Sequence, residues 1–254
     1  MKVSRRHKRG TWRPVLLSCS KDNPLREKLL IAGSIRPVLL AAGLALLADS
    51  GDAAPADFSA CLEELGREAR GRGLSKDVVD AVIAGLQYQP RVIELDRAQP
   101  EFDQTFAAYL RARVTEERVR RGGELLARHA ELLARLTREY GVPGRYLVAF
   151  WGLETNYGSY LGNMPTLDSL ATLACDPRRA GYFAGQFLTG LELLQRESLS
   201  PARMRGSWAG AMGHTQFMPS AYLEHAVDGD GDGRIDLWES EADALASAAN
   251  YLHN

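Results

Sequence analysis

Apolar residues recur at helical spacing along most of the chain after residue 55. The first such segment ends near Gly71 and Gly73, and one face of it is formed by Phe58, Cys61, Leu62, Leu65 and Ala69. A second helix is expected after Ser75, which suits an N-cap, and its apolar face comprises Val78, Val79, Val82 and Leu86. Residues 87–104 contain two prolines and predict a connecting loop.

The pattern then predicts one long amphipathic helix from Thr115 to Gly141, because apolar residues continue along one side without interruption. His129 falls in line with the leucines of that side, which favours a packed histidine over a metal ligand. Pro143 suits the first turn of a following helix that extends to about Asn156.

Two further helices are expected near the C-terminal end, from residue 177 to 197 and from 242 to 254, and Ser240 can cap the second. No alternating strand pattern of useful length occurs. The sequence therefore predicts a mainly α fold.

The first 54 residues differ from the rest. A stretch rich in lysine and arginine precedes the apolar run 37–48, and small residues follow it up to Ala54. This order is typical of a secretory signal. We expect residues 1–54 to form a basic tail and signal peptide, cleaved near Ala54, with an uncleaved membrane anchor as the alternative. Residues 55–254 would then be the functional region, located in the periplasm.

Composition adds two constraints. The chain has 254 residues and a formal net charge of −1, which argues against nucleic acid as a partner, and we expect a monomer. Cys61 and Cys175 remain after the expected cleavage. In an exported protein they either form a disulfide or are two small buried residues.

The segment FWGLETNYG, residues 150–158, places Glu154 at the end of an apolar helix. Removal of a carboxylate from water raises its pKa, which is the property that a general acid needs at neutral pH. The alternative interpretation is a solvated glutamate at a helix end. The segment GSWAGAMGHTQFMP, residues 206–219, surrounds Trp208 with small residues and indicates close backbone approach, either to a ligand or to a packed helix.

The segment DGDGDGRIDLWE, residues 228–239, matches every specified position of an EF-hand calcium loop. Asp228, Asp230 and Asp232 alternate, Gly233 permits the sharp turn, and Glu239 stands at the twelfth position. The alternative is an acidic surface turn. A single such loop indicates a structural ion rather than a paired sensor. Zinc-site spacing, phosphate-binding glycine loops and the serine-hydrolase elbow are not found in the sequence.

These three segments, in this order, resemble the lytic murein transglycosylase B family, from about Phe58 to the C-terminus. The resemblance implies a lysozyme-like catalytic domain with an EF-hand-like calcium loop and a groove for glycan. It implies Glu154 as the catalytic residue and glycan contacts from Tyr109, Ser207, Gln216 and Tyr251. It also implies calcium ligands at Asp228, Asp230 and Asp232 and at the carbonyl of Arg234. The loop pattern nominates Glu239 as the last ligand, whereas the family nominates Asp243, which we favour.

The family pattern continues beyond Asn254, so the resemblance also implies a catalytic region shortened at its C-terminus. The activity that the resemblance implies is a lyase reaction. Glu154 would cleave the β-1,4 bond between N-acetylmuramic acid and N-acetylglucosamine, leaving 1,6-anhydro-muramoyl ends. The expected partners are peptidoglycan strands, with other cell-wall enzymes as further candidates. A lysozyme-like hydrolase of the same bond and a non-catalytic calcium-stabilised binding module are the alternatives.

Overall fold

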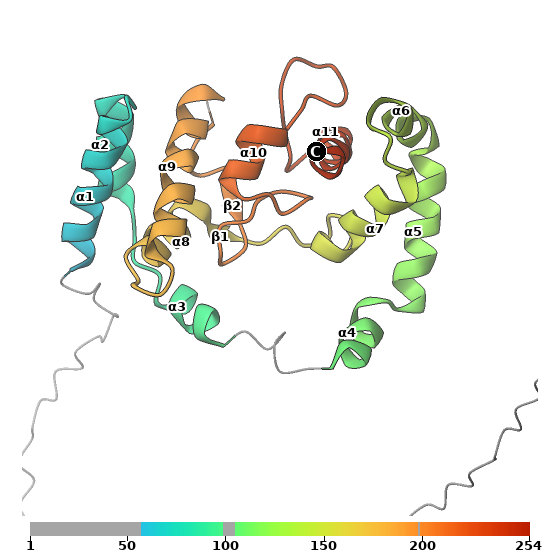
Figure 1. The fold of residues 1–254 in the computed structure, drawn as a ribbon, viewed down its shortest axis with the longest axis horizontal. Helices are drawn as coiled ribbons and strands as arrows, with labels where there is room; N and C mark the ends of the chain where they lie inside the picture. The colour runs from blue at the N-terminus through green and yellow to red at the C-terminus, as the bar shows by residue number, and fades with distance from the viewer. Residues whose placement is uncertain (1–56, 99–104, 198) are drawn as a thin grey trace, which may run out of the picture. The chain divides into compact units, whose positions relative to one another are not determined.

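The structure, a computed structural model, describes residues 57–98, 105–197 and 199–254, and the expected signal peptide lies outside them. The described chain is mainly helical, as predicted (Figure 1). Its elements are α1 (Phe58–Gly71), α2 (Lys76–Gly85), α3 (Pro90–Arg97), α4 (Phe106–Arg113), α5 (Glu116–Arg128), α6 (Ala130–Tyr140), α7 (Gly144–Thr155), β1 (Met164–Pro165), α8 (Thr166–Ala174), α9 (Ala180–Arg196), β2 (Arg205–Gly206), α10 (Pro219–His225) and α11 (Glu241–His253).

One apolar core joins α1, α2, α8, α9 and α10. Phe187 and Leu191 of α9 are fully buried in it, as is Leu170 of α8. Cys61 on α1 and Cys175 at the end of α8 are linked by a disulfide, with 5.8 Å between their Cα atoms. The disulfide alternative is thus the correct one, and it fastens α1 to the core through a covalent bond.

A second core surrounds α7. Helices α5, α6 and α11 each pack against α7, and α11 also packs against α6 (Figure 1). The buried face of α7 comprises Leu147, Val148, Trp151, Gly152 and Thr155. Because the period of an α-helix is 3.6 residues, this face leaves Leu153 and Glu154 on the outer side.

Two predictions about the helices were wrong. Residues 87–104 are not wholly a loop, because Pro90 starts α3 at a position that tolerates its missing N–H. Helix α3 is held in place by two buried residues: Val92 packs in the first core, and Asp96 forms ion pairs with Arg178 and Arg179.

The long helix expected from Thr115 to Gly141 is broken at His129, which ends α5 and precedes α6. The break lets both shorter helices pack against α7. The His129 ring lies edge-on to Trp151, and its Nε2 is 3.0 Å from Oε2 of Glu241. His129 is therefore a packed histidine, and its contacts explain why the chain turns there.

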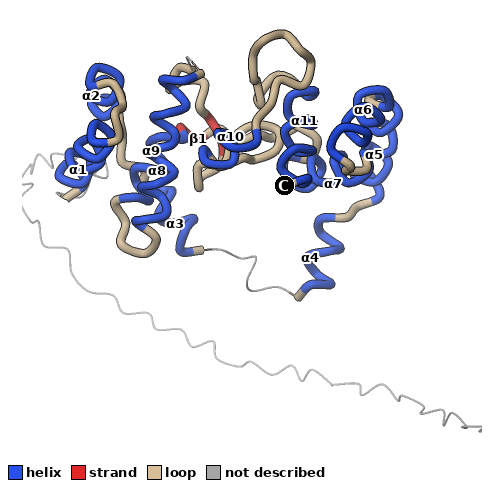
Figure 2. Tube along the Cα trace, turned by 45° about the horizontal axis from the view of Figure 1, so that its top comes forward, coloured by secondary structure: helices blue, strands red, loops and turns tan. Residues whose placement is uncertain are grey.

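Strand structure in the described chain is confined to short pieces (Figure 2). Strands β1 and β2 pair antiparallel, with Met164 opposite Gly206. Met212 bridges to both Gly206 and Phe217, which folds the segment after β2 back on itself. In the described ranges, no helix is both long and apolar enough to cross a membrane.

Candidate active site

Glu154 lies in the last turn of α7 with its side chain on the exposed face of the helix. Trp151 and Thr155, on either side of it in the sequence, are buried, with 1 % and 2 % of their surface exposed. The buried face of α7 therefore fixes the backbone that carries the carboxyl group. The sequence predicted a carboxylic acid at the end of an apolar helix, and Glu154 lies at that position.

The chain turns sharply after Glu154. Asn156, Tyr157 and Gly158 have φ values of 51°, 60° and 76°, so three successive residues are left-handed. Such conformations are unfavourable for residues other than glycine and are held only by surrounding contacts. The Thr155 hydroxyl supplies one of these contacts, since it accepts a hydrogen bond from the Gly158 N–H at 3.0 Å.

Tyr157 supplies the main anchor of this turn. Its hydroxyl donates to the Arg118 carbonyl at 2.7 Å, and its ring lies perpendicular to Trp151 at 5.9 Å. Two glycines make room for the ring: a Cβ at Gly122 would lie 2.7 Å from Tyr157 Oη, and one at Gly152 would lie 2.6 Å from Cε1. The left-handed turn behind Glu154 is thus fixed by packing between α5 and α7.

Burial among protein atoms raises the pKa of Glu154, and the Arg113 guanidinium opposes that shift. The side chain keeps access to water on the exposed face of α7. The carbonyl groups at the C-terminal end of α7 act in the same direction as burial, because a negative charge is unfavourable at that end of a helix. A carboxyl group with a raised pKa is suited to donate a proton at neutral pH.

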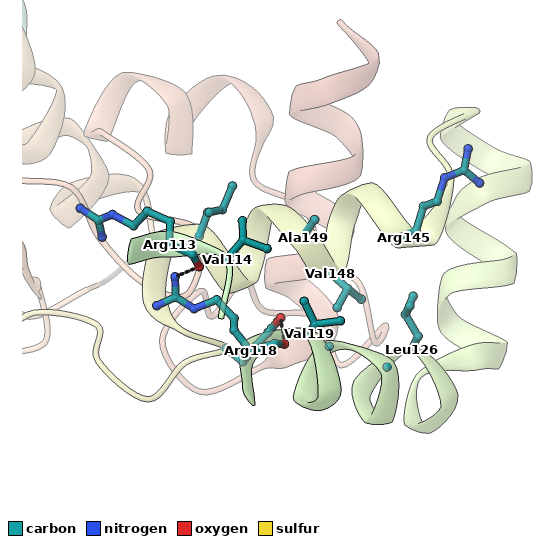
Figure 3. A pocket seen from close by; sticks show the side chains of 12 residues that line it. Arg113, Val114, Arg118, Val119, Leu126, Arg145, Val148 and Ala149 are labelled. Carbon is teal, nitrogen blue, oxygen red and sulfur yellow. Dashed lines mark hydrogen bonds between the residues drawn. The ribbon is translucent and has the colours of Figure 1, made fainter. Parts of the chain in front are cut away.

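An apolar cavity of about 410 Å³ lies between α5 and α7, beside this turn. In Figure 3 its valines lie between Arg113 on one side and Arg145 on the other, and Arg118 donates to the Arg113 carbonyl at 2.6 Å. Leu153 and Tyr157 also line the cavity, whereas Glu154 does not. Arg113 therefore belongs both to the cavity rim and to the electrostatic surroundings of Glu154.

The segment after β2 packs against the end of α7. The Thr155 hydroxyl donates to the His214 carbonyl at 2.8 Å, and the Trp151 indole donates to His214 Nδ1 at 2.9 Å. In this segment the Ser207 hydroxyl accepts from the Ala211 N–H at 3.1 Å and remains free to donate. The backbone approach that the glycines predicted occurs here, since a Cβ at Gly206 would lie 2.0 Å from the Ala211 carbonyl oxygen.

Gln216 occupies a left-handed backbone position, with φ of 50°. Its side-chain nitrogen donates to the carbonyls of Leu161 and Gly213, each at 3.0 Å, which leaves its amide oxygen for another partner. This arrangement fixes the amide across the loop that follows α7. Ser207 and Gln216 thus lie in one tightly folded segment attached to the end of α7.

The two predicted tyrosines lie on different helices, α11 and α4. Tyr251, on α11, stacks on Phe150 of α7 with 6.5 Å between ring centroids and contacts Phe217 at 5.3 Å. Tyr109, on α4, lies under the Arg113 guanidinium at 5.4 Å. Tyr251 is therefore adjacent to both sequence segments of the site, and Tyr109 is connected to Glu154 through Arg113.

The acidic loop brings Asp228, Asp230 and Asp232 together, with carboxylate oxygens within 4.8 Å of one another. The Asp228 carboxylate accepts backbone N–H bonds from Gly233 at 2.8 Å and Gly231 at 2.6 Å. The Gly233 bond is the main cause of the lowered pKa of Asp228. These oxygens form the donor set that a hard cation such as calcium prefers.

The two candidates for the last ligand have different surroundings. Asp243 is 1 % exposed, and its two carboxylate oxygens accept the N–H groups of Gly229 at 2.8 Å and Asp236 at 2.7 Å. Burial raises the pKa of Asp243, and nearby Asp230 adds to that rise. The Glu239 side chain is 80 % exposed and lies 3.7 Å from the Arg203 guanidinium. Asp243 is thus built into the base of the loop, whereas Glu239 points to solvent.

Comparison with known proteins agrees with these observations. The model of the transglycosylase SLT domain family matches residues 57–254. The chain belongs to this family.

Among relatives in the family, the membrane-bound lytic murein transglycosylase B of Escherichia coli K12 is 43% identical over 149 residues, 57% of this chain and 41% of that protein. The structure of SltB3 from Pseudomonas aeruginosa in complex with NAG-NAM-pentapeptide superposes with a TM-score of 0.73 at 43% identity, over 78% of this chain and 53% of that one. The Escherichia coli lytic transglycosylase Slt35 in complex with calcium gives a TM-score of 0.69 at 34% identity, over 76% and 62%. The chain therefore spans about half the length of the relatives it matches.

Three residues near Glu154 could not be recognised from the sequence. Arg113 has no local signature, because only the tertiary fold brings its charge to Glu154. Tyr157 was read as part of a motif, whereas its function is to hold a left-handed turn. His214 belongs to no motif of known chemistry, and its contacts with Trp151 and Thr155 form only in the folded chain.

Proposed function

We propose that this chain is a peptidoglycan lytic transglycosylase. It would cleave the β-1,4 bond between N-acetylmuramic acid and N-acetylglucosamine, leave 1,6-anhydro-muramoyl ends, and work in the periplasm. The observation behind the proposal is the placement of Glu154, on the exposed face of the last turn of α7 and beside the 206–219 segment, in a chain of the transglycosylase SLT domain family. Burial raises the pKa of Glu154, and the Arg113 guanidinium opposes that shift.

Most glycosidases use two carboxylates, one on either side of the scissile bond and about 5 to 9.5 Å apart. A single acid suffices when the substrate supplies the nucleophile. Proximity of a nucleophile within the same sugar then replaces much of what a second carboxylate contributes.

In the proposed reaction, Glu154 gives its proton to the glycosidic oxygen as the bond from that oxygen to muramoyl C1 breaks. The acetamido oxygen of the muramoyl sugar stabilises the charge that develops at C1. The muramoyl 6-hydroxyl oxygen then forms its bond to C1 and loses its proton to the Glu154 carboxylate. Glu154 returns to its starting state and no water is consumed.

The glycan contacts would come from Tyr109, Ser207, Gln216 and Tyr251. The free amide oxygen of Gln216 and the free donor of Ser207 suit hydroxyl and acetamido groups of a sugar. Tyr251 offers an exposed aromatic ring fixed by Phe150 and Phe217. That SltB3 was crystallised with a NAG-NAM-pentapeptide supports a glycan ligand for this family fold.

The acidic loop would hold one structural calcium ion through Asp228, Asp230, Asp232, the Arg234 carbonyl and Asp243. The clustered carboxylates support this proposal, as does the relative Slt35 in complex with calcium. Asp243 is preferred to Glu239 because it is buried against the loop, whereas Glu239 faces solvent. When bound, the ion would neutralise the repulsion among these carboxylates and fix the loop before α11.

Digestion of purified sacculi, followed by mass spectrometry, tests the proposal. Anhydro-muramoyl products are one water lighter than hydrolytic products. Glu154→Gln should reduce cleavage by about 10²–10⁴-fold, whereas Glu131→Gln, at an exposed helical position, should not change it. Reducing muramoyl ends would identify a hydrolase instead, and glycan binding without cleavage would identify a binding module. Normal cleavage by Glu154→Gln would disprove the catalytic assignment.

A further inference from the structure

The two sequence segments of the site meet at His214, which is 7 % exposed. Its imidazole Nδ1 accepts a hydrogen bond from the Trp151 indole at 2.9 Å. Its backbone carbonyl accepts from the Thr155 hydroxyl at 2.8 Å, and its N–H donates to the Leu237 carbonyl at 2.8 Å. One residue thus connects the last turn of α7, the Gly206–Pro219 segment and the segment before α11.

The hydrogen bond with Trp151 defines the protonation of His214. An indole N–H can only donate, so Nδ1 must be without a proton and the neutral ring carries its proton on Nε2. A hydrogen bond between the ring and the Trp238 backbone acts in the opposite direction to burial, because it favours the protonated ring. In the imidazolium form both nitrogens are donors, and the bond from Trp151 cannot form.

The His214 ring has little space to move. A Cβ on Gly158 would lie 2.2 Å from its Cε1, so the ring lies directly on the left-handed turn that follows Glu154. The backbone next to His214 is also closely packed, since a Cβ on Gly213 would lie 2.5 Å from the Leu237 carbonyl oxygen. Any shift of the His214 ring is therefore transmitted to the turn behind Glu154.

We propose that His214 is a positioning residue for Glu154: as a neutral imidazole that accepts from Trp151, it fixes the last turn of α7 and with it the catalytic carboxyl group. The inference rests on the proposed function. His214 does not transfer a proton to the glycan, because its ring is buried and its Nδ1 is occupied by the bond from Trp151. It acts through Trp151 and Thr155.

The charges that face His214 set the pH at which this contact is lost. Glu241 on α11 and Asp236 before it favour the imidazolium, whereas α7 presents the uncharged Trp151 and Thr155. Burial is the larger effect and lowers the pKa of His214. The contribution of the Trp151 bond is therefore present above the ordinary histidine pKa and lost as the pH falls through the lowered value.

Two substitutions separate positioning from simple packing. His214→Asn keeps an acceptor oxygen where Nδ1 stands, whereas His214→Leu fills similar space without an acceptor. A small displacement of a catalytic group can cost about 10²-fold in rate, so His214→Leu should lower kcat about 10- to 100-fold with little change in KM. His214→Asn should restore kcat to within a few fold. Equal kcat for the two variants would overturn the proposal.

A second measurement does not depend on activity. The four tryptophan indole N–H groups give separate signals in a proton–nitrogen correlation spectrum, and Trp151→Phe assigns the relevant one. That signal should shift in His214→Leu, remain in His214→Asn, and move in the parent protein only when acid protonates His214. An unchanged Trp151 signal in His214→Leu or through the acid titration would overturn the proposal. The titration uses the unaltered chain, so it remains decisive if a variant does not fold.

These readouts separate the two levels of inference. If the parent protein does not cleave glycan, the proposed function fails, and the Trp151 signal still decides whether His214 holds α7. If the parent cleaves glycan and the signal does not respond to His214, only the positioning proposal fails.

Discussion

The contact between Gly122 and Tyr157 makes a sharp prediction about the turn behind Glu154. Gly122 and Gly123 are neighbours within α5. A Cβ at Gly122 would lie 2.7 Å from Tyr157 Oη, whereas a Cβ at Gly123 would meet no atom within 4 Å. The two substitutions to alanine therefore share the same change in helix propensity and differ only in the overlap.

The expected effects have opposite signs. Gly123→Ala should stabilise the fold by about 0.5–1 kcal/mol, because glycine loses more backbone entropy than alanine in a helix. Gly122→Ala gains the same stabilisation from backbone entropy. Its methyl group must, however, displace the Tyr157 ring, whose hydroxyl donates a hydrogen bond to the Arg118 carbonyl. Overpacking costs about 1–3 kcal/mol, so Gly122→Ala should be destabilising overall. The difference between the variants isolates the overlap, about 1–3 kcal/mol.

Urea unfolding measures both variants, and a third variant tests the cause. In Tyr157→Phe the atom nearest to the added methyl becomes Cζ, at an ordinary 3.5 Å. Gly122→Ala should then cost little when it is made in the Tyr157→Phe background. If Gly122→Ala costs the same with and without the Tyr157 hydroxyl, or if it stabilises as Gly123→Ala does, the packing argument for the turn is wrong.

Three further predictions concern the disulfide, the acid and the ion. The disulfide between Cys61 and Cys175 closes a loop across a sequence separation of 114 residues, and chain entropy predicts about 4–5 kcal/mol of stabilisation. A reductant should lower the free energy of unfolding of the parent by that amount and should not affect the variant with alanine at both positions. An equal response of parent and variant would refute this prediction. The raised pKa of Glu154 means that its contribution to stability is full below the unfolded glutamate pKa and lost as the pH rises through the folded value. Glu154→Gln should therefore be more stable than the parent near neutral pH but not in acid, and parallel stability–pH curves would contradict this. Calcium at a hundredfold excess over its Kd should stabilise by about 2.7 kcal/mol, and thermal unfolding should show that increment removed by Asp243→Asn and kept by Glu239→Gln; the reverse pattern would assign Glu239 as the ligand.

Much of the fold follows from local signals. Helices α1, α7 and α11 begin or end at residues whose sequence pattern marks the boundary: Gly141 before α7 is left-handed, and the Ser240 hydroxyl caps α11 by accepting from Asp243 N–H. The exceptions have tertiary causes. Helix α3 is stabilised by the ion pairs of Asp96 with arginines about 80 residues away in the chain. The break at His129 occurs inside an unbroken apolar stripe, where periodicity gives no warning.

The site divides in the same way. The proposed catalytic acid and the proposed ion ligands stand in short segments with recognisable spacing, so Glu154 and the Asp228–Asp232 cluster could be singled out from sequence. The groups that contact these residues or affect their charge could not be found from sequence. Arg113 and His214 act on α7 through the fold, from sequence positions about 40 and 60 residues away from Glu154. Pairwise contacts of this kind leave no periodicity or motif in a single sequence.

These two groups control Glu154 in different ways. His214 contacts Trp151, a residue of the second core, where close packing permits little movement. Arg113 acts from the end of α4, a helix without a buried residue, so its charge is held by far fewer contacts. Because Arg113 is the charge that lowers the pKa of Glu154, any movement of α4 away from α7 would raise that pKa and favour the protonated acid. On this proposal His214 acts on the position of the carboxyl group, whereas Arg113 acts on its protonation.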